Sequence, residues 1–393
     1  MKLYLNDLGL LCAAGSCRAE VLKRLLAGDR SGLIATDQFS PSHKMILGQV
    51  TCQLPEIDPK YSYYQCRNNQ LLLAALSQIS KAVDEIIARF GGDRIGIVLG
   101  TSTSGVRNTE LALAWQAKKG DLPDGFHYKQ QQMGAGADFL ATYLGINGPA
   151  YTVSTACSSS GKAFASARRL LNLGICDAVI VGGADSLCSL TVNGFAALES
   201  LSTGFCKPFG LHRDGINIGE AVSLFVLSKE PGAVELKGIG ATSDAYHFSA
   251  PDPAGTTVIS AMQRALDDAG ITPDDIDYLN LHGTATVLND VMESKAVNTL
   301  FGADLAVSSS KGMTGHTLGA AAALELAFCW LLLTSDDERG ALIPNVNEDE
   351  RDSELAPLNL VKKGMVLGRK ISTCQSNSFA FGGNNLSIVI SRA

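Results

Sequence analysis

The chain has 393 residues, of which 46% are hydrophobic and 18% are charged, and it contains 40 glycines. Such a chain can bury a large α/β core with many tight turns, as two or three domains or as one duplicated unit. Its net charge of −7 excludes a broadly basic footprint for nucleic acid, so we expect no nucleic-acid partner.

Strand-like and helix-like segments alternate along the chain, which predicts α/β architecture with mostly buried strands. Short apolar runs predict strands at residues 95–99, 178–181, 222–227 and 388–390. Apolar residues at helical spacing predict helices at residues 71–90 and 257–269.

The two halves of the chain show a weak internal similarity. The similar segments are 97–103 with 279–286, and 153–157 with 372–376. We therefore expect an N-terminal half at residues 1–231 and a C-terminal half at residues 232–393, which meet where proline and glycine punctuate the chain. A chance match of small-residue turns is the alternative.

The ten cysteines are scattered, and no two of them have the C-x-x-C spacing of a zinc or redox site. We therefore expect no metal, and free thiols in a reducing cytoplasm. Asn6 and Asp7 interrupt the apolar start of the chain, unlike the core of a signal peptide. Residues 318–334 form the longest apolar stretch, but Glu325 at its centre predicts a buried core helix and no membrane partner.

Cys157 lies between a strand-like segment and a helical pattern. Ser158–Ser160 can cap that helix, and the positive end of the helix favours a thiolate and lowers the pKa of a cysteine. A thiolate attacks a thioester without an adjacent strong base. A buried, inert thiol is the expectation for the other nine cysteines, whereas the serine-rich corner favours a catalytic role for Cys157.

Two histidines lie in glycine-rich segments. His282 ends a strand-like run and is followed by Thr284 and Thr286, and His316 precedes a long helical pattern. Neutral imidazoles can donate hydrogen bonds to a thioester carbonyl as negative charge grows on it, which the decarboxylation of a malonyl thioester requires. An ordinary core histidine is the alternative for either residue. Neither H-x-x-x-H nor Cys/His ligand spacing supports a zinc site.

Glu325 is a lone acidic residue in an apolar helical pattern, and a buried glutamate needs a partner. Lys311 is the candidate, and its charge could then fix the protonation states of its neighbours. Nearer the C-terminus, Gly382 and Gly383 allow a backbone N–H to approach a ligand closely. Phe379 and Phe381 beside them could gate an apolar tunnel, although a simple hairpin turn is the alternative.

Together these motifs resemble the β-ketoacyl-[acyl carrier protein] synthases of the elongating type, over nearly the whole chain. The motifs that carry the resemblance are residues 155–160, 213–215, 219–221, 282–284, 311–316, 319–321, 377–379 and 381–383. The resemblance implies a thiolase-like fold, in which two pseudo-symmetric halves, each with a five-stranded sheet, form a five-layer αβαβα sandwich. It also implies a dimer.

The resemblance also implies roles for individual residues. Cys157 accepts the acyl chain, and His282 and His316 promote decarboxylation of malonyl-[acyl carrier protein]. The carbanion then attacks the Cys157 thioester and releases 3-oxoacyl carrier protein and carbon dioxide. The backbone N–H groups of Cys157 and Phe381 form the oxyanion hole. Supporting residues are Lys311, Glu325, Asp290, Glu293, Thr284 and Thr286, and gating residues are Phe379, Phe381, Gly382 and Gly383. No cofactor is expected, because the phosphopantetheine arm of acyl carrier protein delivers the acyl groups.

Four positions depart from the usual family pattern: Ala285, Val287, Ala380 and Asn384 replace glycine, proline, glycine and threonine. These changes disfavour housekeeping membrane-lipid synthesis. The pattern is similar to ketosynthases of aryl polyene pigment pathways, which pair with a cysteine-less chain-length partner, so the dimer is either a homodimer or a heterodimer.

Two other functions fit these residues less well. A non-catalytic chain-length factor would lack the nucleophile that is present here as Cys157. A hydrolytic enzyme with a Cys-His pair would need neither a second histidine nor Lys311. For the surface that docks acyl carrier protein, Arg67, Lys129 and Arg168 are basic candidates.

Overall fold

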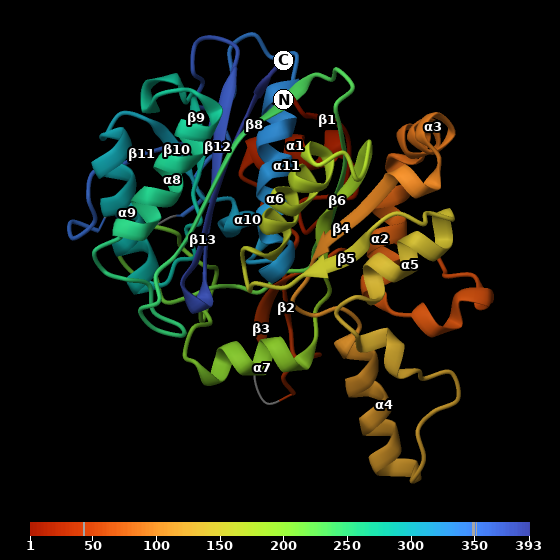
Figure 1. Cartoon of the computed structure of the whole chain (residues 1–393). Coiled ribbons are helices and arrows are strands. Elements are labelled where there is room, and N and C mark those ends of the chain that lie inside the picture. Colours follow the sequence, from red (N-terminus) through yellow and green to blue (C-terminus); the bar gives the residue numbers. More distant parts are fainter. Residues whose placement is uncertain (42–43, 348–349, 351) are drawn as a thin grey trace.

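The fold is known from a computed structural model that describes residues 1–41, 44–347, 350 and 352–393. Eleven strands are hydrogen-bonded in the order β11-β10-β9-β12-β13-β8-β1-β7-β6-β4-β5 (Figure 1). In chain order they are β1 (Tyr4–Leu11), β4 (Ile95–Gly100), β5 (Ala150–Val153), β6 (Ala178–Asp185), β7 (Ala221–Ser228), β8 (Val234–Ser243), β9 (Tyr278–Asn280), β10 (Ala306–Ser308), β11 (Asn359–Leu360), β12 (Thr373–Ala380) and β13 (Asn384–Arg392). A separate hairpin consists of β2 (Leu33–Thr36) and β3 (Met45–Gly48).

The same five-strand arrangement occurs twice. β4 pairs in parallel with β5 and β6, and β6 continues through antiparallel pairs to β7 and β1. β9 likewise pairs in parallel with β10 and β12, and β12 continues to β13 and β8. The pairing of Tyr4 with Glu235 joins the two sets, and β11 adds an edge strand to the second. The predicted repeat is therefore present, although the two sets form one continuous ladder.

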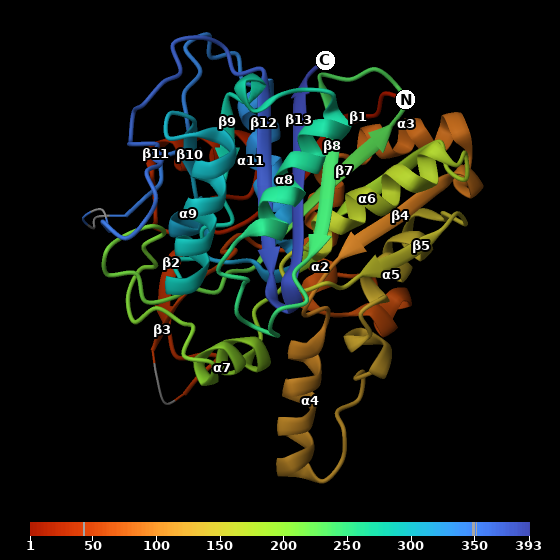
Figure 2. The ribbon, with the colours of Figure 1, turned by 60° about the vertical axis from the view of Figure 1, so that its left-hand side comes forward.

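Helices lie between the two sets of strands and on their outer faces, which gives five layers. Their bounds are α1 (Arg18–Ala27), α2 (Arg67–Gln78), α3 (Ser80–Phe90), α4 (Val106–Lys119), α5 (Ala135–Leu144), α6 (Ser159–Asn172), α7 (Ser189–Ala197), α8 (Thr256–Ala269), α9 (Val287–Phe301), α10 (Lys311–Thr314) and α11 (Ala321–Thr334). α6 and α11 pack on each other and on strands of both sets, so they form the central layer. α2, α3 and α5 cover the first set, and α8 and α9 cover the second (Figure 2).

Most element predictions agree with this fold. Strands β4, β6, β7 and β13 contain the four predicted runs, and α8 matches the helix predicted at residues 257–269. The single helix predicted at residues 71–90 is wrong, because the chain leaves helical geometry at Ile79, with φ −118° and ψ 12°. The Ile79 side chain is fully buried in the core under the first set of strands, and the break lets both α2 and α3 pack there.

One proposed internal repeat is correct and the other is wrong. Segments 97–103 and 279–286 run from within β4 and β9 into the loops after them, and these two strands occupy equivalent positions in the two sets. The counterpart of β5, which precedes Cys157, is β10, whereas residues 372–376 lie in and beside β12, the counterpart of β6. A match of a few small residues could not distinguish neighbouring parallel strands. The boundary between residues 231 and 232 stays a prediction; it lies in the link from β7 to β8.

The long apolar stretch is a core helix. All residues from Ala321 to Leu333 in α11 are buried, Glu325 included. Within the described parts of the chain, no helix has the length and apolar character needed to cross a bilayer.

Candidate active site

Cys157 lies at a tight corner between β5 and α6. The residue before it, Ala156, has φ 52°, a left-handed conformation that is costly for a residue with a side chain. Such local strain is tolerated where the surrounding structure holds the backbone firmly. The corner directs the Cys157 thiol inward, where it is 6% exposed.

The serines beside the thiol hold this corner in place. Ser158 and Ser159 donate side-chain hydrogen bonds back to carbonyl oxygens of residues 155 and 156, at 2.9 and 2.5 Å. The Ser160 hydroxyl accepts from the N–H of Ala323 in α11, at 2.9 Å. The predicted side-chain cap is therefore wrong, since these hydroxyl groups brace the turn and tie α6 to α11 instead.

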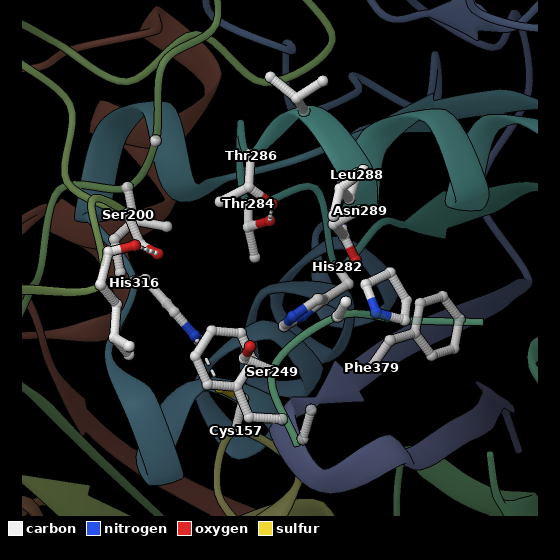
Figure 3. A pocket seen from close by; sticks show the side chains of 18 of the residues that line it. Cys157, Ser200, Ser249, His282, Thr284, Thr286, Leu288, Asn289, His316 and Phe379 are labelled. Atoms are coloured by element: carbon white, nitrogen blue, oxygen red, sulfur yellow. Dashed lines mark hydrogen bonds between the residues drawn. The ribbon is translucent and has the colours of Figure 1, made fainter. Parts of the chain in front are cut away.

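The fold brings the thiol and both imidazoles together (Figure 3). His316 Nε2 lies 2.9 Å from the Cys157 sulfur, and the two imidazole rings are 5.5 Å apart between centroids. The sulfur and one nitrogen of each ring all lie within 4.8 Å of one another. Three residues from separate segments can therefore act on one substrate carbon at the same time.

The segment that carries His282 is anchored by acidic residues of α9. Glu293 accepts hydrogen bonds from the N–H groups of His282 and Gly283, each at 2.7 Å. Asp290 accepts from the N–H of Phe209 at 2.8 Å. Glu293 therefore acts through the backbone of the His282 loop, and Asp290 through the backbone of Phe209 in the chain before β7.

The segment that carries His316 is held by the chain before β7. The His316 N–H donates to Asn217 O at 2.6 Å, and its carbonyl accepts from the N–H of Gly219 at 2.9 Å. A Cβ atom added at Gly219 would lie 2.4 Å from the carbonyl oxygen of Thr314. Close backbone contact at this point therefore requires glycine, which explains the glycine of the 219–221 motif.

Lys311 and Glu325 form a buried ion pair behind the histidines. Both residues are at most 2% exposed, and Lys311 Nζ donates to Glu325 Oε1. The same ammonium group donates to the carbonyl oxygen of His282 at 2.5 Å. The structure thus brings together the two residues whose pairing the sequence suggested, and it adds a direct link to one histidine.

Burial decides the protonation states in the site. Desolvation, followed by the nearby Lys311 charge, lowers the pKa of His282 and of His316 well below 6.5, so both imidazoles are neutral at neutral pH. Desolvation also raises the pKa of the Cys157 thiol to about 12, against the opposing effects of Lys311 and the Phe381 N–H. The predicted lowering of this pKa by the helix terminus is therefore wrong, because loss of solvent outweighs it. A protonated thiol thus faces a neutral imidazole nitrogen that can accept its proton.

Three buried carboxyl groups around the loop and the ion pair are also perturbed. Burial is the main cause in each case, and it raises the pKa of Glu293 and of Glu325 to about 7. It raises the pKa of Asp290 to about 6.

The glycine turn that follows β12 contributes to the same site. The N–H groups of Phe381 and of Cys157 both face the sulfur and favour its charged form. Gly382 and Gly383 have φ 78° and 71°, which fits the need for glycine in this turn. The Phe379 ring lies 6.1 Å from that of His282. The structure therefore places both predicted oxyanion donors at Cys157 and the predicted gating residues Phe379 and Phe381 on the wall of the cavity above it, while their roles stay predictions.

A cavity of about 330 Å³ opens over the thiol and both histidines. Thr284 and Thr286 line one side, and their hydroxyl groups are 2.9 Å apart. Further lining residues that the sequence reasoning missed are Phe195, Leu198, Ser200, Ser249 and Pro251. They come from α7 and from irregular segments without a motif, so nothing in the sequence pattern marked them.

Two of the family departures differ in their structural effect. Ala285 has φ 62°, so alanine occupies a left-handed position at which the usual family residue is glycine. Ala380 has φ −97° and ψ 155°, which is extended backbone that any residue adopts. Val287 begins α9 and is exposed at the rim of the cavity.

The thiol and the two histidines are also close enough to share a metal ion. The Lys311 charge that lowers both histidine pKa values disfavours a further cation. The absence of a metal in the functional protein stays a prediction.

The three basic candidates for the carrier-protein surface have acidic partners. The pairs are Arg67 with Glu220, Lys129 with Asp138, and Arg168 with Asp268. The partner of Arg67, Glu220, also accepts a hydrogen bond from the Val50 N–H at 3.1 Å, so this ion pair is tied to the interior of the protein. None of the three therefore stands out as a free positive charge in the described chain.

Two family models together match most of this chain. Residues 53–233 match the family model described as "Beta-ketoacyl synthase, N-terminal domain", and residues 233–347 match "Beta-ketoacyl synthase, C-terminal domain". The chain is 33% identical to 3-oxoacyl-[acyl-carrier-protein] synthase 2 of Staphylococcus aureus (strain COL), over 86% of this chain and 84% of that protein. It is 30% identical to nodulation protein E of Rhizobium meliloti, over 98% and 97% of the two chains.

A solved structure extends the similarity to the whole fold. The ketosynthase ApeO from Xenorhabdus doucetiae, solved in complex with its chain length factor ApeC, superposes with a TM-score of 0.95 and 44% identity. The match covers 100% of this chain and 98% of that one. The thiolase-like fold class is thereby confirmed, and the enzyme is an acyltransferase of the condensing type. The chain belongs to the β-ketoacyl synthase family.

Proposed function

We propose that this protein extends an acyl chain held as a thioester on Cys157, by decarboxylative condensation with malonyl-[acyl carrier protein]. The observation that carries the proposal is the 2.9 Å contact between the Cys157 sulfur and His316 Nε2, with His282 in reach of the same point. A hydrolytic Cys-His site would leave His282 and the buried Lys311 without a role.

In the first step, His316 Nε2 takes the thiol proton as the Cys157 sulfur attacks the incoming thioester carbonyl. Negative charge on the carbonyl oxygen is met by the N–H groups of Cys157 and Phe381, which already face the sulfur. The tetrahedral intermediate then collapses, its bond to the carrier thiol breaks, and that thiol leaves with the proton. The raised pKa of Cys157 makes this proton transfer necessary.

Before the second step, His316 changes tautomer by losing its Nδ1 proton and taking one at Nε2 from water, so that both neutral imidazoles can donate hydrogen bonds to the carbonyl oxygen of the malonyl thioester. The carbon–carbon bond to the malonyl carboxylate breaks and carbon dioxide leaves. The electron pair of that bond stays with the malonyl carbon and forms an enolate, which the two hydrogen-bond donors stabilise. The enolate carbon attacks the Cys157 thioester, the carbon–sulfur bond breaks, and the released thiolate takes up one proton from water. Neutral imidazoles suit this role, and burial beside Lys311 keeps them neutral.

The partners in this proposal are acyl carrier protein and a second subunit. Three similar solved structures support it: two contain a ketosynthase with a chain length factor, and one contains a ketosynthase with its acyl carrier protein. We favour a heterodimer with a chain-length-factor paralogue over a homodimer, in an aryl polyene or related polyketide pathway of the cytoplasm. The chain itself is not the non-catalytic subunit in this proposal, because Cys157 is present and contacts His316. No cofactor is needed when phosphopantetheine delivers both substrates.

The test is intact-protein mass spectrometry after incubation with an acyl carrier protein thioester. We expect one acyl adduct on the wild-type protein, none on Cys157→Ala, and an unchanged adduct on Cys17→Ala, which removes an exposed thiol. An adduct that persists on Cys157→Ala, or a wild-type protein that is never acylated, would contradict the proposal.

A further inference from the structure

One side-chain contact ties the nucleophile helix to the glycine turn. Lys162, in the first part of α6, donates from Nζ to Asn384 Oδ1 at 2.5 Å. Asn384 is the first residue of β13 and directly follows the Phe381–Gly383 turn. The contact therefore connects the helix that starts just after Cys157 with the turn that supplies the second oxyanion donor.

Lys162 is an unexpected residue at this place. It is half-buried, and desolvation is the cause that lowers its pKa. A cation this close to the N-terminus of a helix is disfavoured by the helix dipole. Among the described residues, no carboxylate lies within ion-pair distance of its ammonium group, and the neutral Asn384 amide is its hydrogen-bond partner. The hydrogen bond to Asn384 is therefore the polar contact that offsets the desolvation of this ammonium group.

The turn has further contacts besides the one that involves Lys162. The Gly382 N–H donates to Phe248 O at 2.8 Å, and Gly383 O accepts from the Asp244 N–H at 2.9 Å. The Phe381 ring packs 5.7 Å from that of Phe195. Two successive glycines with positive φ make this segment able to change its backbone direction. The link to Lys162 thus adds a side-chain contact to a turn that backbone hydrogen bonds also hold.

We propose that Lys162 is a positioning residue that latches the Phe381–Gly383 turn to α6 through Asn384, and so sets the direction of the Phe381 N–H. The family usually has threonine at position 384. The asparagine here has a side chain long enough to reach Lys162. Removing the donor should free the turn, and converting the amide to a carboxylate should tighten it. These two opposite effects test whether the contact holds the turn, and the comparison of two kinetic steps below separates a positioning role from a purely structural one.

Hydrogen exchange measured by mass spectrometry tests the latch without any assay of activity. We expect Lys162→Met to raise exchange of the segment 379–386 about tenfold, as loss of a hydrogen bond to a charged group predicts. Asn384→Asp should lower exchange there, and Lys162→Arg should resemble the wild type. Lys81→Met, which alters an exposed lysine on α3, is the matched control. Equal exchange in Lys162→Met and wild type, or faster exchange in Asn384→Asp, would overturn the proposal.

A kinetic measurement tests the consequence for the site and rests on the proposed function. We expect Lys162→Met to slow acylation of Cys157 by about three- to tenfold, because a misdirected Phe381 N–H stabilises the negative charge of the transition state less well. Decarboxylation of the malonyl thioester, which depends on the histidines, should change less. Equal losses in both steps, together with general destabilisation, would show a structural role and refute the positioning role. If the wild type were not acylated at all, the proposed function would fail while the exchange result would still decide the latch.

Discussion

Replacing Lys311 with methionine removes a buried ammonium group that contacts both Glu325 and the carbonyl oxygen of His282. Methionine keeps most of the length of the side chain but leaves the Glu325 carboxylate buried without its cation. Breaking a buried ion pair by removing one partner costs about 3–5 kcal/mol of unfolding free energy. We expect a loss of that size for Lys311→Met.

The double variant Lys311→Met/Glu325→Leu separates charge from packing. Leucine at position 325 matches the apolar residues around it on α11, so the unpaired carboxylate is gone. Replacing both charges by apolar side chains of similar volume is often close to neutral. The His282 carbonyl would still lack its donor, which leaves a deficit of about 1–3 kcal/mol. We therefore expect the double variant to be clearly more stable than the single one.

Urea-induced unfolding of the wild type and both variants measures these differences, and malonyl decarboxylation measures the effect on the site. Both variants should decarboxylate more slowly near neutral pH, because the His282 carbonyl oxygen loses its donor and the Lys311 charge, the second cause of the lowered histidine pKa values after desolvation, is gone. A double variant as unstable as Lys311→Met would refute the account of the ion pair. Wild-type decarboxylation in the double variant would refute the role of Lys311 in holding the histidines neutral.

Two further predictions follow from the loop that carries His282. Ala285→Gly should change the unfolding free energy by less than about 1 kcal/mol, because relief of the left-handed strain is offset by a lost buried methyl group and a more flexible unfolded chain. Thermal unfolding measures it, and a large loss would show that the strain is negligible. For Glu293, burial raises the folded pKa from 4.5 to about 7, so the folded state holds this proton more tightly than the unfolded chain. Its stabilising effect is full below the unfolded pKa and is lost as the pH rises to about 7. Glu293→Gln should therefore flatten the fall of unfolding free energy between about pH 5 and pH 7, and an unchanged slope would contradict the assignment.

Much of the local structure follows from the sequence alone. The buried strands β4, β6, β7 and β13 are continuous apolar runs, and such runs are recognisable without knowledge of their neighbours. The motif residues around Cys157, His282 and His316 also carry enough information to identify the family. The break at Ile79 could not be predicted, because the helical pattern continues through it and only packing on the sheet requires the turn.

The properties of the site were decided by the tertiary structure. Cys157 and His316 are 159 residues apart in the sequence, and their 2.9 Å contact exists because two central helices and their preceding corners meet between the sheets. The sequence placed Cys157 before a helix and suggested a lowered pKa, yet the folded protein raises it. A helix terminus is a local feature, whereas desolvation depends on every segment that closes around the thiol. Which groups ionise in this site is therefore fixed by burial that no single stretch of the chain contains.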